Sequence, residues 1–313
     1  MKQKNNFPRA FIDLAQIGRT NWQSVALTFL LVKFLTILFS LSSVIAVHSS
    51  IFSEHGLFNI SEADRTIVFK VVEAVACIFG LWLACKKIQQ RPFRSLISID
   101  MTFDIRRCLL GATLYLTANA VSFMAISLFS SMRAGAWVFP FRHVEWPHQN
   151  EQIVASMGEL IIIPFLAFSE ELFFRAWLTQ TLGRYIRSTI TVVVLVAVLF
   201  AVAHSQYDLR VKTLVMLSSL GFSALSLRDQ RLELAIGAHA MLNVCATLQL
   251  LFFTGPSPHV QIPATTLDWC TLAVLKGILP FALIYGVLQK TRGWFVPANA
   301  RLESPGNIQP RHL

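Results

Sequence analysis

Apolar residues along the chain form long, nearly uninterrupted runs, which short polar or charged stretches separate. A run of about 20 apolar residues can cross a bilayer as a helix, because a helix pairs every backbone polar group internally. Eight such runs are present, approximately at 24–47, 66–85, 108–130, 153–182, 188–204, 213–227, 232–253 and 271–288. The pattern predicts an all-α fold, a polytopic transmembrane helix bundle with about eight spans.

The order of these runs suggests four regions. The first, 1–152, is an N-terminal membrane region with three spans. Basic and apolar residues mix over 91–107, which predicts an interfacial helix leading into the third span. The remaining regions are a core at 153–253, an outer loop and last span at 254–295, and a disordered tail at 296–313.

Composition and charge agree with a membrane protein. Of the 313 residues only 14% are charged and 54% are hydrophobic, whereas soluble domains average about 25% charged residues. The net charge is +10, but the basic residues lie between the apolar runs, which fits lipid headgroups and argues against nucleic acid. Most of the Lys and Arg residues fall in the N-terminal segment and in every second segment between the predicted spans, which places those segments in the cytoplasm. We therefore expect a multi-pass inner-membrane protein with both termini cytoplasmic. The five cysteines have no metal-ligand spacing.

The first of three polar clusters within these runs is Glu170-Glu171-x-x-x-Arg175. A charged side chain inside a membrane costs on the order of 3 kcal/mol, so each one needs a partner or a function. Glu171 and Arg175 lie four residues apart and can pair, whereas Glu170 is turned about 100° away. Because Pro164 cannot donate to the carbonyl of Leu160, the helix can bend and admit water beside the carboxylate.

The other two clusters are Phe200-x-x-x-His204, which closes the fifth run, and His239-x-x-x-Asn243 in the seventh. Alone, each cluster has a structural explanation, such as a salt-bridged helix end, a capped histidine or a polar contact between helices. The expected depths of Glu170 and His204 agree, and His239 would join them if the seventh helix begins deeper or tilts. Together the clusters favour a functional site.

These motifs resemble those of the CPBP family (CAAX protease and bacteriocin-processing, also called Abi), intramembrane proteases related to the Ras-converting CAAX prenyl endopeptidases. The family pattern EExxxR, FxxxH and HxxxN is complete here, over roughly 153–250. Two departures are Ala176, where many members have Gly, and Glu233, where an apolar residue is usual. The resemblance implies that the region 153–253 is a protease core and that the protein is a membrane endopeptidase, often acting near the C-terminus of a substrate.

The mechanism we favour is hydrolysis of a peptide bond by an activated water. Glu170, desolvated among apolar helices, would act as the base on a water that His204 also holds. His239 and Asn243 would donate hydrogen bonds to the carbonyl oxygen as it becomes an oxyanion. The supporting residues are Glu171, Arg175 and Phe200.

Several alternatives stay open. No cofactor is favoured, yet Glu170, His204 and His239 could instead bind zinc. We prefer the metal-free form because the histidines lack an orienting carboxylate other than Glu171, which Arg175 is expected to occupy. The expected partners are a membrane protein or peptide substrate and the lipid bilayer. A transporter or proton-coupled carrier, and a non-catalytic self-immunity or scaffold protein, are the competing functions.

Overall fold

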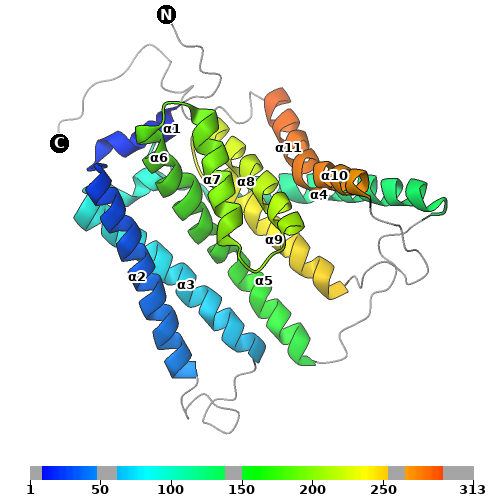
Figure 1. The fold of residues 1–313 in the computed structure, drawn as a ribbon, viewed down its shortest axis with the longest axis horizontal. Coiled ribbons are helices and arrows are strands. Elements are labelled where there is room, and N and C mark those ends of the chain that lie inside the picture. The colour runs from blue at the N-terminus through cyan, green and yellow to red at the C-terminus, as the bar shows by residue number, and fades with distance from the viewer. Residues whose placement is uncertain (1–8, 48–61, 138–149, 253–264, 292–313) are drawn as a thin grey trace, which may run out of the picture.

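The computed structural model describes residues 9–47, 62–137, 150–252 and 265–291, and within these ranges the regular structure is helical (Figure 1). The α-helices are α1 (Ala10–Asp13), α2 (Trp22–Val47), α3 (Glu62–Ala84), α4 (Ile105–Ala134), α5 (Asn150–Glu171), α6 (Thr179–Tyr185), α7 (Thr189–Ala203), α8 (Leu209–Asp229), α9 (Glu233–Phe252), α10 (Thr266–Ala273) and α11 (Leu279–Lys290). Five shorter segments accompany them, the 3-10 turns η1 (Leu14–Ile17) and η3 (Phe93–Leu96) and the π-helical turns η2 (Cys85–Gln89), η4 (Leu172–Leu178) and η5 (Val274–Ile278).

Four of the described helical stretches are long and apolar enough to cross a membrane. They are Trp22–Ile45, Arg65–Gln89, Ile105–Ala134 and Thr266–Lys290, and α7 is a shorter apolar helix. This confirms the all-helical class and a membrane protein. The count of eight spans, the four regions and the cytoplasmic position of both termini stay predictions, and the expected tail at 296–313 lies outside the described residues.

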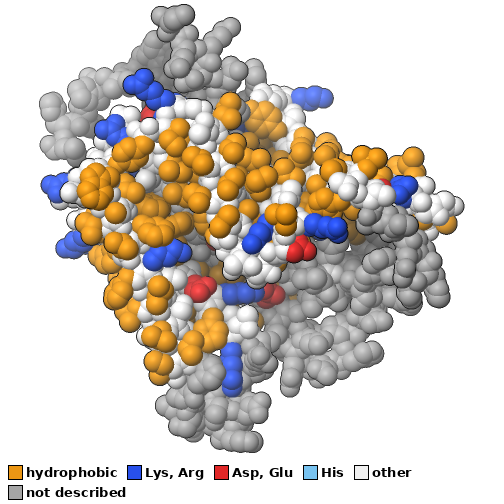
Figure 2. Space-filling view, viewed as in Figure 1, with side chains coloured by type: hydrophobic (Ala, Val, Ile, Leu, Met, Phe, Trp, Pro, Cys, Tyr) orange, Lys and Arg blue, Asp and Glu red, His pale blue; other side chains and the backbone are white. Residues whose placement is uncertain are grey.

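The surface is more apolar than that of a typical soluble protein, and the interior contains charged side chains beside its apolar core. Large apolar side chains on α2 point outward, including Leu30 and Phe34, which are 61% and 60% exposed. Figure 2 shows hydrophobic side chains spread over the face in view, as a lipid-facing surface requires. Polar and charged side chains such as Glu171 and Arg175 are buried instead.

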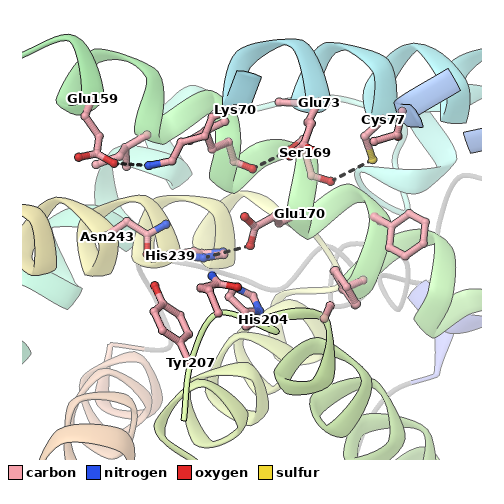
Figure 3. Close-up of a pocket in the computed structure, with 18 of the residues that line it drawn as sticks. Lys70, Glu73, Cys77, Glu159, Ser169, Glu170, His204, Tyr207, His239 and Asn243 are labelled. Atoms are coloured by element: carbon pink, nitrogen blue, oxygen red, sulfur yellow. Dashed lines mark hydrogen bonds and ion pairs between the residues drawn. The ribbon is translucent and has the colours of Figure 1, made fainter. Parts of the chain in front are cut away.

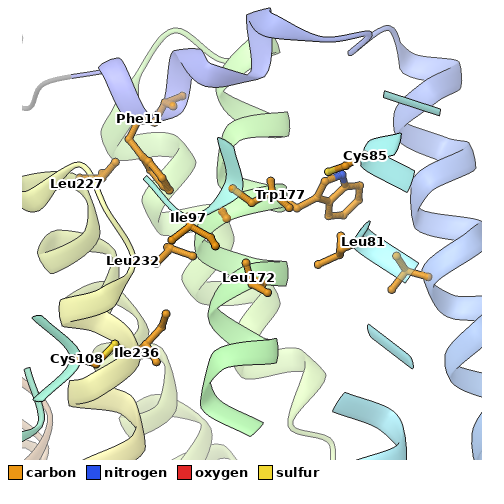
Figure 4. Close-up of a cluster of buried hydrophobic side chains, with 14 residues drawn as sticks. Phe11, Leu81, Cys85, Ile97, Cys108, Leu172, Trp177, Leu227, Leu232 and Ile236 are labelled. Carbon is orange, nitrogen blue, oxygen red and sulfur yellow. The ribbon is translucent and has the colours of Figure 1, made fainter. Parts of the chain in front are cut away.

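The helices pack in the spatial order α2, α3, α5, α9 and α4, with α7 and α8 lying as a pair beside α9 (Figure 1). A buried apolar cluster joins the N-terminal turn to this layer through Phe11, Leu81, Leu172, Trp177 and Leu232 (Figure 4). Leu172 of this cluster directly follows Glu171 in the sequence. Packing of the cluster therefore fixes the helix that carries the first motif.

Glycines allow α9 and α4 to approach each other closely. A Cβ atom added at Gly237 would lie 1.8 Å from the carbonyl oxygen of Cys108, and one at Gly111 would lie 2.2 Å from that of Leu234. Small residues at membrane helix interfaces permit such backbone contact. The contact fixes the position of α9, which carries the third motif.

The segment 91–107 is not the interfacial helix that the sequence predicts. It contains only the 3-10 turn η3, and α4 begins at Ile105. After this turn the chain contacts the connection between α8 and α9, where Arg231 donates to Asp100 (2.5 Å) and to the carbonyl of Thr102 (3.1 Å). Burial disfavours the charge of Asp100, but nearby hydroxyl donors and Arg231 outweigh it and hold the pKa of this carboxyl below its ordinary value.

Candidate functional site

Glu170 and Glu171 end α5, directly before the π-helical turn η4. Such turns, with hydrogen bonds from i to i+5, often lie at functional sites. As the spacing predicts, Glu171 is fully buried and pairs with Arg175, with 3.1 Å between Oε1 and Nη1. The side chain of Glu170 is 34% exposed and faces a cavity instead.

His239 on α9 lies against both carboxylates. Its Nδ1 lies 2.8 Å from Oε1 of Glu171. Its Nε2 lies 3.7 Å from Oε2 of Glu170 (Figure 3). An ionised carboxylate only accepts hydrogen bonds, so Nδ1 donates to Glu171. The contact with Glu170 is longer than a hydrogen bond. The first and third motifs therefore meet.

The second motif ends α7 beside the other two. Nδ1 of His204 lies 2.8 Å from the backbone carbonyl oxygen of Phe200, which can only accept, so Nδ1 donates and Nε2 is left as an acceptor. The ring of Phe200 packs against both imidazoles, with centroid distances of 4.6 Å to His204 and 5.9 Å to His239. Phe200 thus separates and orients the two histidines.

Arg175 supports this arrangement from outside the cavity. Its side chain is 1% exposed, and its guanidinium carbon lies 4.0 Å from the ring centroid of Phe200 and 5.2 Å from that of Phe222. These are cation–π distances. Phe222 in turn stacks on His239, with 4.6 Å between centroids and 21° between the planes. One buried cation therefore contacts a carboxylate and two rings that hold the histidines.

Two cavities meet at these residues. The larger, of about 700 Å³, lies among α2, α3, α5 and α9, and Glu170 lines it. The smaller, of about 210 Å³, lies on the side of α4, α8 and η5. Five residues line both cavities, namely His204, Tyr207, His239, Asn243 and Ala246. The predicted residues therefore surround a junction between two spaces.

Sequence reasoning missed Tyr207. It follows α7 and stacks parallel to His204, with 5.9 Å between centroids and 11° between the planes. In Figure 3 its hydroxyl points toward the space beside Asn243 and His239. Tyr207 belongs to none of the motifs, and its only signal in the sequence is its position three residues after His204.

The departure at Glu233 has a structural explanation. This residue is the first of α9, it pairs with Arg231 (2.7 Å), and it accepts from the backbone N–H of Asp104 (3.0 Å). The carboxylate therefore anchors the start of the helix that carries His239.

A zinc ion at this site would have Glu170, His204 and His239 as its ligands. Each histidine has Nδ1 on an acceptor and makes no hydrogen bond through Nε2, an orientation typical of metal ligands. Arg175 occupies Glu171 as expected, and His239 shares the same carboxylate, which therefore also orients this histidine. Across the part of the chain that the structure describes, however, no three His, Cys, Asp or Glu side chains form a group that could hold a metal. As arranged, the set does not fit the ion.

Comparison with known proteins gives a family match and one relative. Residues 153–245 match the family model described as Type II CAAX prenyl endopeptidase Rce1-like. The "Uncharacterized protein YyaK" of Bacillus subtilis (strain 168) is 26% identical over 172 residues, which are 53% of this chain and about half, 54%, of the relative. No solved structure matches significantly. The matched segment contains all three motifs, which confirms the resemblance to CAAX-type intramembrane proteases.

Proposed function

We propose that the protein is an intramembrane endopeptidase, which hydrolyses a peptide bond of a membrane-associated or lipidated substrate. The observation that carries this proposal is the meeting of Glu170, His204 and His239 at one cavity in a bundle whose outer surface is apolar. A carboxylate with an accessible oxygen and an imidazole with a free Nε2 are the groups that water activation needs. The match of residues 153–245 to a CAAX endopeptidase model supports the same chemistry.

The proposed reaction begins with a water between Glu170 and His204. Glu170 removes one proton from this water, and Nε2 of His204 accepts a hydrogen bond from the other. The water oxygen then bonds to the substrate carbonyl carbon, and the π electrons move to the carbonyl oxygen. When this tetrahedral intermediate collapses, the C–N bond breaks and Glu170 returns the proton to the leaving amine.

The developing oxyanion needs hydrogen-bond donors. Asn243 offers its amide N–H to the same space. Because Nδ1 of His239 donates to Glu171, its Nε2 can donate to the oxyanion only when the ring carries both protons. Two carboxylates, Arg175 and a protonated His239 form a neutral set, and Glu171 would thereby hold the donor form of the ring.

The decisive variant is Glu170→Gln, which keeps the shape of the side chain and removes the base. We expect loss of cleavage with folding and membrane insertion intact. Glu73→Gln is the matched control, because Glu73 lines the same cavity but belongs to none of the motifs. C-terminal peptide proteomics of a deletion strain, complemented with each variant, would first identify substrates for assays with purified protein. Processing by Glu170→Gln at the wild-type rate would contradict the proposal.

The metal-free form of the reaction needs a separate measurement. Metal analysis of the purified active protein should find no stoichiometric zinc, and a chelator should leave the cleavage rate unchanged. A stoichiometric zinc whose removal and return follow activity would overturn the metal-free choice. Uptake assays in proteoliposomes would test the carrier alternative.

A further inference from the structure

The smaller cavity extends the site to the other side of α9. Its volume of about 210 Å³ equals about seven water molecules at the density of the liquid, enough for a short peptide segment and too little for a folded one. Polar side chains line it beyond the shared motif residues, among them Tyr115, Asn119, Ser218 and Gln249. A substrate crossing the junction would place one end in this space.

The charges of the two cavities differ. The larger cavity contains acids and bases together, including an ion pair between Lys70 and Glu159 (2.5 Å) and the carboxylate of Glu73. Lys276 is the only Lys, Arg, Asp or Glu residue among the described residues that line the smaller cavity. The smaller cavity therefore carries a positive charge that its own lining does not balance.

Lys276 is in a costly position. It belongs to η5, in the middle of the candidate span Thr266–Lys290. Within the described ranges no carboxylate lies within 4.0 Å of its ammonium group, in contrast to Lys70. A cation within a membrane helix is expensive unless a partner or a ligand offsets the cost.

We propose that Lys276 binds a carboxylate of the substrate in the smaller cavity, which positions the scissile bond at the junction. This inference rests on the proposed endopeptidase function. A carboxylate fits because one negative charge balances one ammonium, and because the amides of Asn119 and Gln249 can donate to its remaining oxygen lone pairs. Two sources share this chemistry: the terminal carboxylate of a short C-terminal segment, and an Asp or Glu side chain close to the scissile bond.

The test measures binding, so it does not depend on cleavage. The full chain with Glu170→Gln, reconstituted in lipid nanodiscs, is titrated with three fluorescent hydrophobic pentapeptides. One has a free C-terminal carboxylate, one is the C-terminal amide, and one is the amide with a single Glu near its end. We expect the acid or the Glu peptide to bind about tenfold more tightly than the plain amide, as a charge-assisted contact would give. Whichever peptide gains affinity identifies the source.

Variants assign the preference to Lys276. Lys276→Met should bind all three peptides equally, whereas Lys276→Arg should keep the preference. Lys290→Met, on α11 and outside the lining of both cavities, is the matched control and should also keep it.

Equal affinity for all three peptides in the protein that retains Lys276 would overturn the proposal without any variant having to fold. A preference that survives in Lys276→Met would overturn it as well. Processing by Glu170→Gln at the wild-type rate would contradict the proposed function but would leave a measured carboxylate preference standing, so the two failures are distinguishable.

Discussion

Gly237 offers a direct test of how helix packing positions the site. A Cβ atom at this position would lie 1.8 Å from the carbonyl oxygen of Cys108, whereas ordinary contacts begin at 3.4 Å. The obstructing atom belongs to the backbone of α4 and cannot rotate away. Gly237→Ala therefore requires α4 and α9 to shift relative to each other by about 1.6 Å, the difference between these two distances.

A shift of this size affects the site because His239 lies two residues after Gly237. Its Nδ1 is 2.8 Å from Glu171 and its Nε2 is 3.7 Å from Glu170, so a movement of α9 by more than 1 Å changes both contacts. Overpacking of this kind costs about 1–3 kcal/mol of stability. A misplacement of about 1 Å at a catalytic group can cost about 100-fold in rate. We expect losses of these sizes in Gly237→Ala.

The measurements are an unfolding titration in detergent and the cleavage rate of a substrate identified as above. Gly286→Ala is the matched control, since nothing lies within 4 Å of a Cβ atom at Gly286 on α11. It should keep both stability and activity. Wild-type stability and rate in Gly237→Ala would refute the close contact between α4 and α9.

Two further predictions concern buried and peripheral charges. Arg175→Met should lower the free energy of unfolding by about 3–5 kcal/mol, because it leaves Glu171 buried without its cation. The double variant Arg175→Met/Glu171→Gln should lose less stability than the sum of the two single variants. Additive losses in SDS unfolding would refute this coupling. Asp100 has a lowered pKa in the folded protein, so its contribution to stability is present above its unfolded pKa of about 3.9 and is lost as the pH falls through the folded value. The melting temperature of the wild type should therefore exceed that of Asp100→Asn near neutral pH and approach it below about pH 4, and a pH-independent difference would contradict this role.

The sequence predicts the parts of the site that depend on helical periodicity. The spacing of Glu171 and Arg175 correctly indicates their ion pair, and the 100° rotation between neighbours correctly turns Glu170 toward a different environment. The meeting of the motifs follows from the cost of polar groups in apolar helices, since each of them needs a partner. These inferences need only local geometry and burial.

Helical periodicity does not predict contacts between segments that are distant in the sequence. Glu171 binds Arg175 and His239 together, although periodicity alone assigns it only the neighbour on its own helix. The segment 91–107 looks amphipathic, but Arg231, more than a hundred residues later, holds its backbone in a non-helical path. Tyr207 reaches the site through a loop, whose conformation no period describes.

The different environments of Glu170 and Glu171 explain why two adjacent acids, and not one, occupy these positions. A fully buried carboxylate can fix an imidazole, because no water competes for its oxygen atoms, but the same burial keeps a substrate water away from it. A carboxylate that faces a cavity can reach water, but solvent competes for its contact with the ring. Successive positions on one helix separate these two environments by about 100° while keeping both within reach of His239. The pair thus supplies a buried, orienting acid and an acid that faces the cavity from one turn of α5, and α9 needs to place only one imidazole between them.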